Sequence, residues 1–128
     1  MIAFENIECD LKIKKKEFSV WLNEIIIEEN KLLGDIVYVF CDDDYLLAKN
    51  IKYLNHNTLT DVITFDYSKN KLISGDILIS IDRVRENSNI FGVQFLNELQ
   101  RVMVHGLLHL LGYNDKTKKE EKEIREKE

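Results

Sequence analysis

The sequence predicts a single α+β domain in which a small mixed sheet of about four strands packs with about five helices. Three observations lead to this prediction. The length of 128 residues is typical of one domain. Short β-branched segments alternate with segments whose apolar residues recur at helical spacing. The chain also lacks proline, internal repeats and Gly/Ser-rich linkers, so residues 1–128 are expected to form one domain.

The first half of the chain is predicted to alternate strands and helices. Residues 2–7 are a candidate edge strand, and residues 36–41 form a β-branched and aromatic strand. Between them, apolar residues recur at helical spacing over residues 18–26. A further helix is expected over residues 42–53, because it begins with consecutive aspartates, which suit the positive end of a helix.

The second half is predicted to hold two strands and a long helix. The strands cover residues 62–65 and 72–81. Residues 94–111 form the longest helical candidate, polar on one side up to Arg101 and then apolar nearly all round, which predicts a central position in the domain. The charged tail, residues 116–128, is expected to be a solvated terminal helix or frayed chain.

Composition and charge exclude several classes of protein. Hydrophobic residues make up 45% and charged residues 32% of the chain, which is typical of a folded globular protein. The longest strongly apolar stretch, residues 102–111, is far shorter than the ~20 residues of a membrane span, so no membrane anchor is expected. The net charge of −5 argues against nucleic-acid binding over the whole surface, although a local basic strip is compatible with it.

The start of the chain and its cysteines indicate the compartment. No apolar secretion signal is present. Cys9 and Cys41 lie far apart without a Cys-x-x-Cys spacing, which favours two reduced thiols over a disulfide framework. The protein is therefore predicted to be cytoplasmic.

The segment from residue 105 to residue 115, HGLLHLLGYND, is the one that carries chemistry. His105 and His109 are four residues apart on a predicted helix, so both imidazoles project from one face and can reach the same metal ion. Gly112 can end the helix in a left-handed conformation and bring Asp115 back beneath the rings. Three such ligands leave one tetrahedral position open for water, the arrangement of catalytic zinc, so one zinc ion is the predicted cofactor.

An open metal position implies hydrolysis as the reaction type. The simplest alternative is a pair of core histidines bonded to the backbone, with Asp115 in an ordinary turn. A buried imidazole pair without a shared partner costs desolvation energy, which favours the metal. Peptidases with a related motif carry Glu directly after the first histidine as general base, and that position is Gly106 here, whereas a phosphodiester substrate depends less on a side-chain base.

The run HGLLHLLGYND closely resembles the signature HGxLHLxGYDH of the YbeY family of metal-dependent endoribonucleases. Upstream matches follow in the same order: Leu54-Asn55, the run TDVITF at residues 60–65 against the family's TDVLSF, and Gly75-Asp-Ile. The resemblance covers residues 54–115. It implies a zinc ion held by residues 105, 109 and 115, cleavage of single-stranded RNA, maturation of the 3′ end of 16S rRNA with the small ribosomal subunit, and ribosome quality control.

Two positions depart from the family pattern. The third ligand is usually histidine and is Asp115 here; its charge is expected to weaken the ion as a Lewis acid and to favour slightly harder ions such as manganese. The arginine that the family carries between the Leu-Asn and Thr-Asp-Val motifs is absent. Arg83, Arg85 and Arg101 are the candidates to bind RNA phosphates in its place, and for Arg101 a salt bridge with Glu98 is an equal alternative.

Neighbouring acids and aromatic residues offer further candidates. The acids that could orient the imidazoles are Asp61, Asp66 and Asp76, and the aromatic residues that could stack on bases are Phe65, Tyr67 and Tyr113. Turn or cap roles are favoured slightly for Asp61 and Asp76, and packing roles for the aromatic residues.

The leading hypothesis is a cytoplasmic zinc-dependent endoribonuclease of rRNA maturation whose partners are RNA and the small ribosomal subunit. The first rival is a non-catalytic ribosome-assembly factor with a structural metal. The second rival is a small metzincin-like metallopeptidase, which Gly106 disfavours. Neither the general base nor the oligomeric state follows from the sequence.

Overall fold

The computed structural model describes residues 1–55, 59–113, 122 and 126. Its elements are β1 (Ile2–Asn6), α1 (Lys15–Glu28), β2 (Leu32–Cys41), α2 (Asp43–Leu54), β3 (Val62–Asp66), β4 (Leu72–Ser80), α3 (Ile81–Phe91) and α4 (Phe95–Leu110). The prediction of an α+β fold with a four-stranded mixed sheet is confirmed, and the described part of the chain holds four helices where about five were predicted. In that part, no helix has the length and apolar character to span a bilayer.

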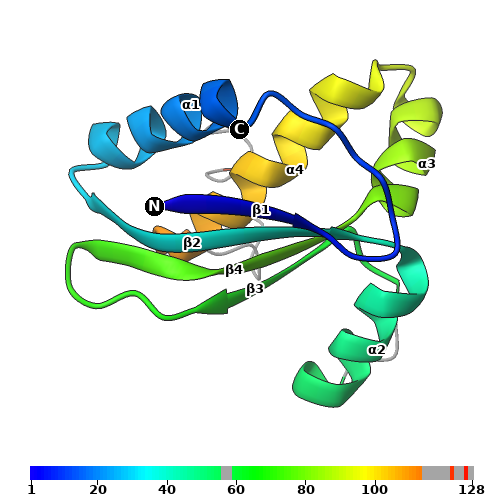
Figure 1. Ribbon diagram of the computed structural model, residues 1–128, viewed down its shortest axis with the longest axis horizontal. Coiled ribbons are helices and arrows are strands. Elements are labelled where there is room, and N and C mark those ends of the chain that lie inside the picture. Colours follow the sequence, from blue (N-terminus) through cyan, green and yellow to red (C-terminus); the bar gives the residue numbers. More distant parts are fainter. Residues whose placement is uncertain (56–58, 114–121, 123–125, 127–128) are drawn as a thin grey trace.

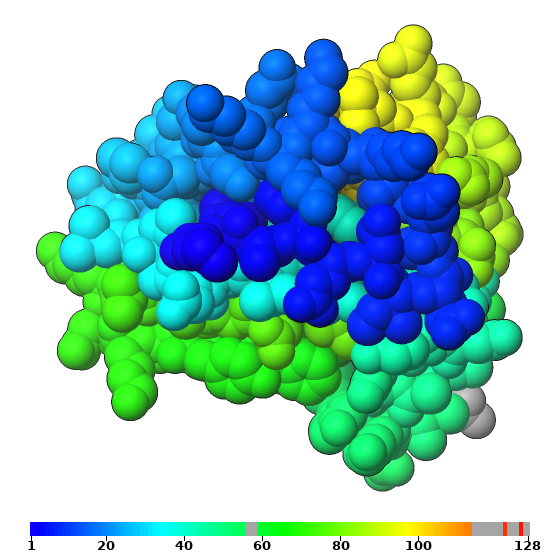
Figure 2. Space-filling view, in the orientation of Figure 1, coloured from blue at the N-terminus to red at the C-terminus, as the bar shows by residue number. Residues whose placement is uncertain are grey.

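The sheet has the strand order β1-β2-β4-β3. β1, β2 and β4 run parallel, and β3 pairs antiparallel with β4, so β3 forms one edge of the sheet. β1 forms the other edge and lies at the molecular surface, with α1 above it and the green segments around residues 65–75 below it (Figure 2).

Helices cover the two faces of the sheet unequally. Ile36, Tyr38 and Phe40 of β2 point to the face that α1 and α4 bury, and all three are nearly inaccessible to solvent. The alternate residues Val39 and Cys41 point to the opposite face, where α2 packs at one end only (Figure 1). The described helices therefore cover only part of the second face.

α4 lies centrally against the sheet, as its apolar pattern predicts. Met103 and Leu107 are completely buried, and the Tyr38 hydroxyl on β2 donates a hydrogen bond to the Met103 carbonyl at 2.9 Å. Gly106 permits the close approach of α4, because a Cβ at this position would lie 2.7 Å from Ile77 Cγ2 and 3.3 Å from Val62 Cγ2. A side chain at this position would therefore push α4 away from β3 and β4.

α3 was not predicted from the sequence, which extended the preceding strand to Ile81 and assigned no helix to the residues that follow. Ser80 ends β4 and caps α3, because its side chain accepts a hydrogen bond from the Arg83 backbone N–H at 3.3 Å. Ile81 and Val84 are the buried hydrophobic residues of this helix. So small an apolar stripe gives little helical periodicity to detect.

The two cysteines are free, as predicted, with Cys9 partly buried and Cys41 fully buried. The Cys41 Sγ donates to the Ile79 carbonyl on β4. Burial raises the pKa of Cys41 to about 12, so its thiol stays protonated and serves packing.

Replacing Gly106 by Ala is expected to lower the free energy of unfolding by about 1–2 kcal/mol, measured by urea denaturation. Overpacking against Ile77 costs about 1–3 kcal/mol, which exceeds the gain in helix propensity of up to ~1 kcal/mol.

The double variant Gly106→Ala/Ile77→Leu is the matched test, because leucine lacks the Cγ2 methyl that the new Cβ would meet. It is expected to recover part of the loss. A Gly106→Ala protein more stable than the parent would show that α4 does not depend on this contact.

Candidate metal-binding active site

The candidate metal ligands His105 and His109 lie one turn apart on α4, and their ring nitrogens converge. The two Nε2 atoms are 3.1 Å apart, and the ring planes meet at 76°. Both side chains are partly buried. The predicted placement of two imidazoles on one helix face is therefore present in the fold.

The turn after α4 fixes the orientation of the His109 ring. Gly112 has a φ of 103°, so the chain reverses there as predicted. The carbonyl of Tyr113 then lies 3.1 Å from His109 Nδ1. Because a carbonyl only accepts, Nδ1 carries the proton and Nε2 keeps the lone pair that a metal requires.

The spacing of the two histidines fits a tetrahedral zinc ion. Zinc–nitrogen bonds of 2.0–2.1 Å place two ligand nitrogens about 3.3–3.4 Å apart. The observed 3.1 Å needs only a small opening to reach that value. Within residues 1–55 and 59–113, no group of three metal-binding side chains is present, and the predicted third ligand, Asp115, lies outside the described residues.

The histidines open into a pocket of about 280 Å³ at the edge of the sheet. Its wall consists of Leu54, residues 60–64, His105 and His109. Residues 62–64 belong to the edge strand β3, so the pocket lies between this strand and α4. β3 is the last strand on this side of the sheet.

Asp61 is the acid that the fold places in this pocket. It lies beside His105, and its carboxylate is 3.8 Å from the Arg101 guanidinium. Burial raises the pKa of Asp61, and the positive charges of Arg101 and His105 only partly offset this effect. From the sequence, Asp61 was a candidate to orient the imidazoles, with a turn or cap role slightly favoured, and the fold places it beside His105.

Arg101 is held by a buried partner. Glu98 is 2% exposed and accepts two hydrogen bonds from Arg101, at 2.9 Å and 2.7 Å. The salt bridge that the sequence offered as one alternative is therefore present. It does not remove Arg101 from the site, because the same guanidinium reaches Asp61 at the pocket wall.

The other two candidate arginines lie away from this pocket. Arg83 binds Asp43 at 3.1 Å, and Asp43 in turn accepts a hydrogen bond from Ser80, so the arginine joins the starts of α2 and α3. Arg85 stacks over the Phe95 ring at 4.9 Å. Among the described residues, none of the three candidate arginines lines the pocket itself, and their contact with RNA stays a prediction.

Two of the candidate acids occupy other positions. Asp66 accepts a hydrogen bond from the Ser68 backbone at 2.9 Å in the turn after β3. Asp76 faces the opposite side of the sheet from α4, in a groove that Phe65 and Tyr67 also line.

The third candidate aromatic residue, Tyr113, donates a hydrogen bond from its hydroxyl to the carboxylate of Glu29, on the segment after α1.

Gly106 also bears on the peptidase interpretation. A Cβ at this position would already meet Ile77 at 2.7 Å, so the space beside the first histidine cannot hold a glutamate. The general base of that enzyme class is therefore absent for a steric reason as well as by sequence.

Comparisons with known proteins point to one family. The family model described as Endoribonuclease YbeY matches residues 3–128. The protein named Endoribonuclease YbeY from Flavobacterium psychrophilum is 54% identical over 129 residues, covering 100% of this chain and 91% of the relative. Its namesake from Flavobacterium johnsoniae is 46% identical over 129 residues, covering 100% of this chain and 92% of the relative.

A solved structure is also similar to this chain. The solution structure of TM1509 from Thermotoga maritima matches with a TM-score of 0.70 and 28% identity, covering 99% of this chain and 83% of that chain. The fold is thus shared along nearly the whole length.

Replacing Arg101 by Gln is expected to lower the free energy of unfolding by about 1–3 kcal/mol, because the buried Glu98 carboxylate loses the guanidinium that binds it. The range lies below that of a fully buried pair because the Arg101 side chain is 39% exposed. Urea denaturation measures the change.

The double variant Glu98→Gln/Arg101→Gln removes both charges and is expected to be more stable than Arg101→Gln alone. Equal stability of the parent and Arg101→Gln would contradict a stabilising role for the pair.

Proposed function

The chain belongs to the YbeY family of endoribonucleases, and on this basis we propose that it hydrolyses single-stranded RNA in the pocket beside His105 and His109. The observation that carries the proposal is the convergence of the two Nε2 atoms, 3.1 Å apart, in a pocket that the edge strand β3 leaves accessible. RNA is therefore the substrate and partner of this enzyme.

The metal site in this proposal consists of His105, His109 and Asp115, with one zinc ion as the cofactor. The fixed tautomer of His109 and the ligand spacing both support it. Two imidazoles and one carboxylate are an established donor set for catalytic zinc. When bound, the ion would supply a Lewis acid that activates water near neutral pH and polarises the phosphoryl group.

Arg101 and Asp61 have complementary roles at this site. Arg101 does not line the pocket itself, but its partly exposed guanidinium lies 3.8 Å from the Asp61 carboxylate at the pocket wall, and it can bind a phosphate oxygen while Glu98 holds its position. Asp61 lies beside His105 and can orient that imidazole. Arg101 therefore takes the place of the loop arginine that this chain lacks.

The biological setting is also part of the proposal, supported by the family resemblance and, for the compartment, by the two free cysteines. We place the enzyme in the cytoplasm, at the small ribosomal subunit, in the maturation of the 3′ end of 16S rRNA and in ribosome quality control. A non-catalytic assembly factor with a structural metal is the rival function, and an RNA cleavage assay distinguishes the two.

Protein purified without chelator is expected to contain about one zinc ion, which His105→Ala and His109→Ala lose because each removes a ligand. Elemental analysis measures the content. His56→Ala, which removes the remaining histidine of the chain, is the matched control and should keep the metal. Full zinc content in either ligand variant would refute the site.

The same preparations separate the rival functions. Zinc-loaded protein should cleave single-stranded RNA, chelated protein should not, and casein should stay intact. Retention of zinc without RNA cleavage would favour the assembly factor, and casein degradation the peptidase.

Asp115→His is expected to lower the pH at which RNA cleavage reaches half its maximum and to favour zinc over manganese. A neutral imidazole neutralises less of the ion's positive charge than an anionic carboxylate does. The bound water therefore loses its proton at lower pH. Asp115→Glu keeps the charge and serves as the control. An unchanged pH–rate profile and metal preference in Asp115→His would contradict the role of Asp115.

A further inference from the structure

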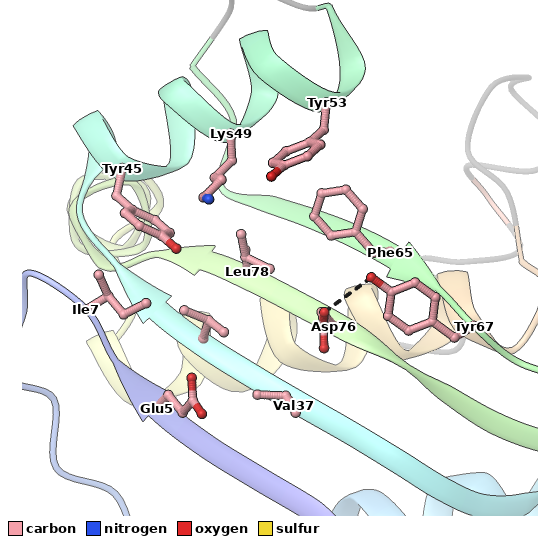
Figure 3. A pocket seen from close by; sticks show the side chains of 11 residues that line it. Glu5, Ile7, Val37, Tyr45, Lys49, Tyr53, Phe65, Tyr67, Asp76 and Leu78 are labelled. Atoms are coloured by element: carbon pink, nitrogen blue, oxygen red, sulfur yellow. Dashed lines mark hydrogen bonds between the residues drawn. The ribbon is translucent and has the colours of Figure 1, made fainter.

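A second hollow lies on the face of the sheet opposite α4 and has no part in the site described above. This groove has a volume of about 500 Å³, within the range of small-ligand sites. Val37 and Leu78 form its apolar floor, α2 forms one wall, and Tyr67 lies on the far side (Figure 3). Among the described helices, α2 packs on this face at one end only (Figure 1), and the groove residues Tyr53 and Tyr67 are exposed to solvent.

Several aromatic rings line this groove, and two of them are too exposed to belong to the core. Tyr53 is 53% exposed and Tyr67 is 59% exposed. The Tyr53 ring meets Phe65 edge to face, with centroids 5.7 Å apart, and thereby joins the α2 wall to β3. Exposed rings beside an apolar floor are the surface on which nucleobases stack.

Charged groups of both signs line the groove at separate places. The Lys49 ammonium projects from α2 and lies 5.2 Å and 5.4 Å from the ring centroids of Tyr45 and Tyr53. Glu5 and Asp76 project from the sheet (Figure 3). The carboxylates disfavour a free phosphate, whereas a nucleotide offers a flat ring, N–H donors and a phosphate together.

Asp76 is positioned to read the edge of a base. The Tyr67 hydroxyl donates a hydrogen bond to its Oδ2 at 3.4 Å, and no hydrogen bond from another described residue occupies its other oxygen. An ionised carboxylate only accepts hydrogen bonds, so it selects bases that present N–H groups. Guanine presents two adjacent N–H donors on its Watson–Crick edge, whereas uracil presents one N–H between two acceptor carbonyls.

The groove and the histidine pocket lie back to back across the edge strand β3. Thr64 lines the histidine pocket, and the next residue, Phe65, lines the groove, because successive strand side chains point to opposite faces. At the end of α2, Leu54 likewise lines the histidine pocket, and Tyr53 lines the groove. A flexible RNA strand that crosses the β3 edge can therefore occupy both hollows.

We propose that the groove is a base-binding subsite for a guanine of the RNA strand that enters the histidine pocket, with Tyr67 stacking on the base, Asp76 accepting its N–H groups and Lys49 facing the adjacent phosphate. The proposal rests on RNA being the substrate of that pocket. It assigns sequence preference to a surface separate from the residues that carry out hydrolysis.

Binding of short oligonucleotides to chelated, catalytically silent protein tests the subsite. Fluorescein-labelled UUUGUU is expected to bind roughly tenfold more tightly than UUUUUU, measured by fluorescence anisotropy. Asp76→Asn should abolish this preference, because an amide offers a donor where guanine also donates. Tyr67→Ala should weaken both oligonucleotides, and Phe91→Ala, which removes an aromatic residue of similar exposure on α3, should change neither.

The readouts keep this proposal distinct from the hydrolase proposal. His105→Ala should lose RNA cleavage and keep the guanine preference, and Phe91→Ala should keep both. Equal binding of the two oligonucleotides, or a preference that survives in Asp76→Asn, would overturn the subsite. Binding of an arginine-rich peptide that depends on Glu5 and Asp76, without a guanine preference, would assign the groove to a basic protein segment instead.

Discussion

The close packing of α4 against β3 and β4 is the constraint on which the site depends. Gly106 faces Ile77 and Val62 so closely that no side chain fits between the helix and the sheet. Its neighbour His105 is consequently held at a fixed distance from the β3 wall. The same contact that completes the core therefore sets the width of the pocket in which RNA is proposed to bind.

A row of polar side chains along α4 continues this arrangement from the histidines to a buried carboxylate. Glu98, Arg101 and His105 follow one another at intervals of three and four residues, so they share one helix face. A buried carboxylate is costly alone, and Arg101 compensates it while reaching Asp61. The pair therefore stabilises the fold and keeps a cation beside the histidines.

β3 separates two surfaces with different chemistry. Its threonine side faces the imidazoles, and its phenylalanine side faces an open groove with tyrosines, a lysine and two carboxylates. Because β3 is an edge strand, the two surfaces meet where the sheet ends. A division into one surface for hydrolysis and one for base preference would let each change by mutation without disturbing the other.

The sequence by itself determined the local elements other than α3, and the histidine pair, because helical and strand periodicity and a four-residue spacing are short-range properties. It also determined the family, through motifs that are contiguous in the chain. Only the tertiary structure decided that Asp61 lies beside the histidines and Asp76 on the opposite face, since strand register and helix packing assign these faces. The partners of Arg83 and Arg101, and the capped start of α3 at Ser80, likewise depend on contacts between segments that periodicity does not encode.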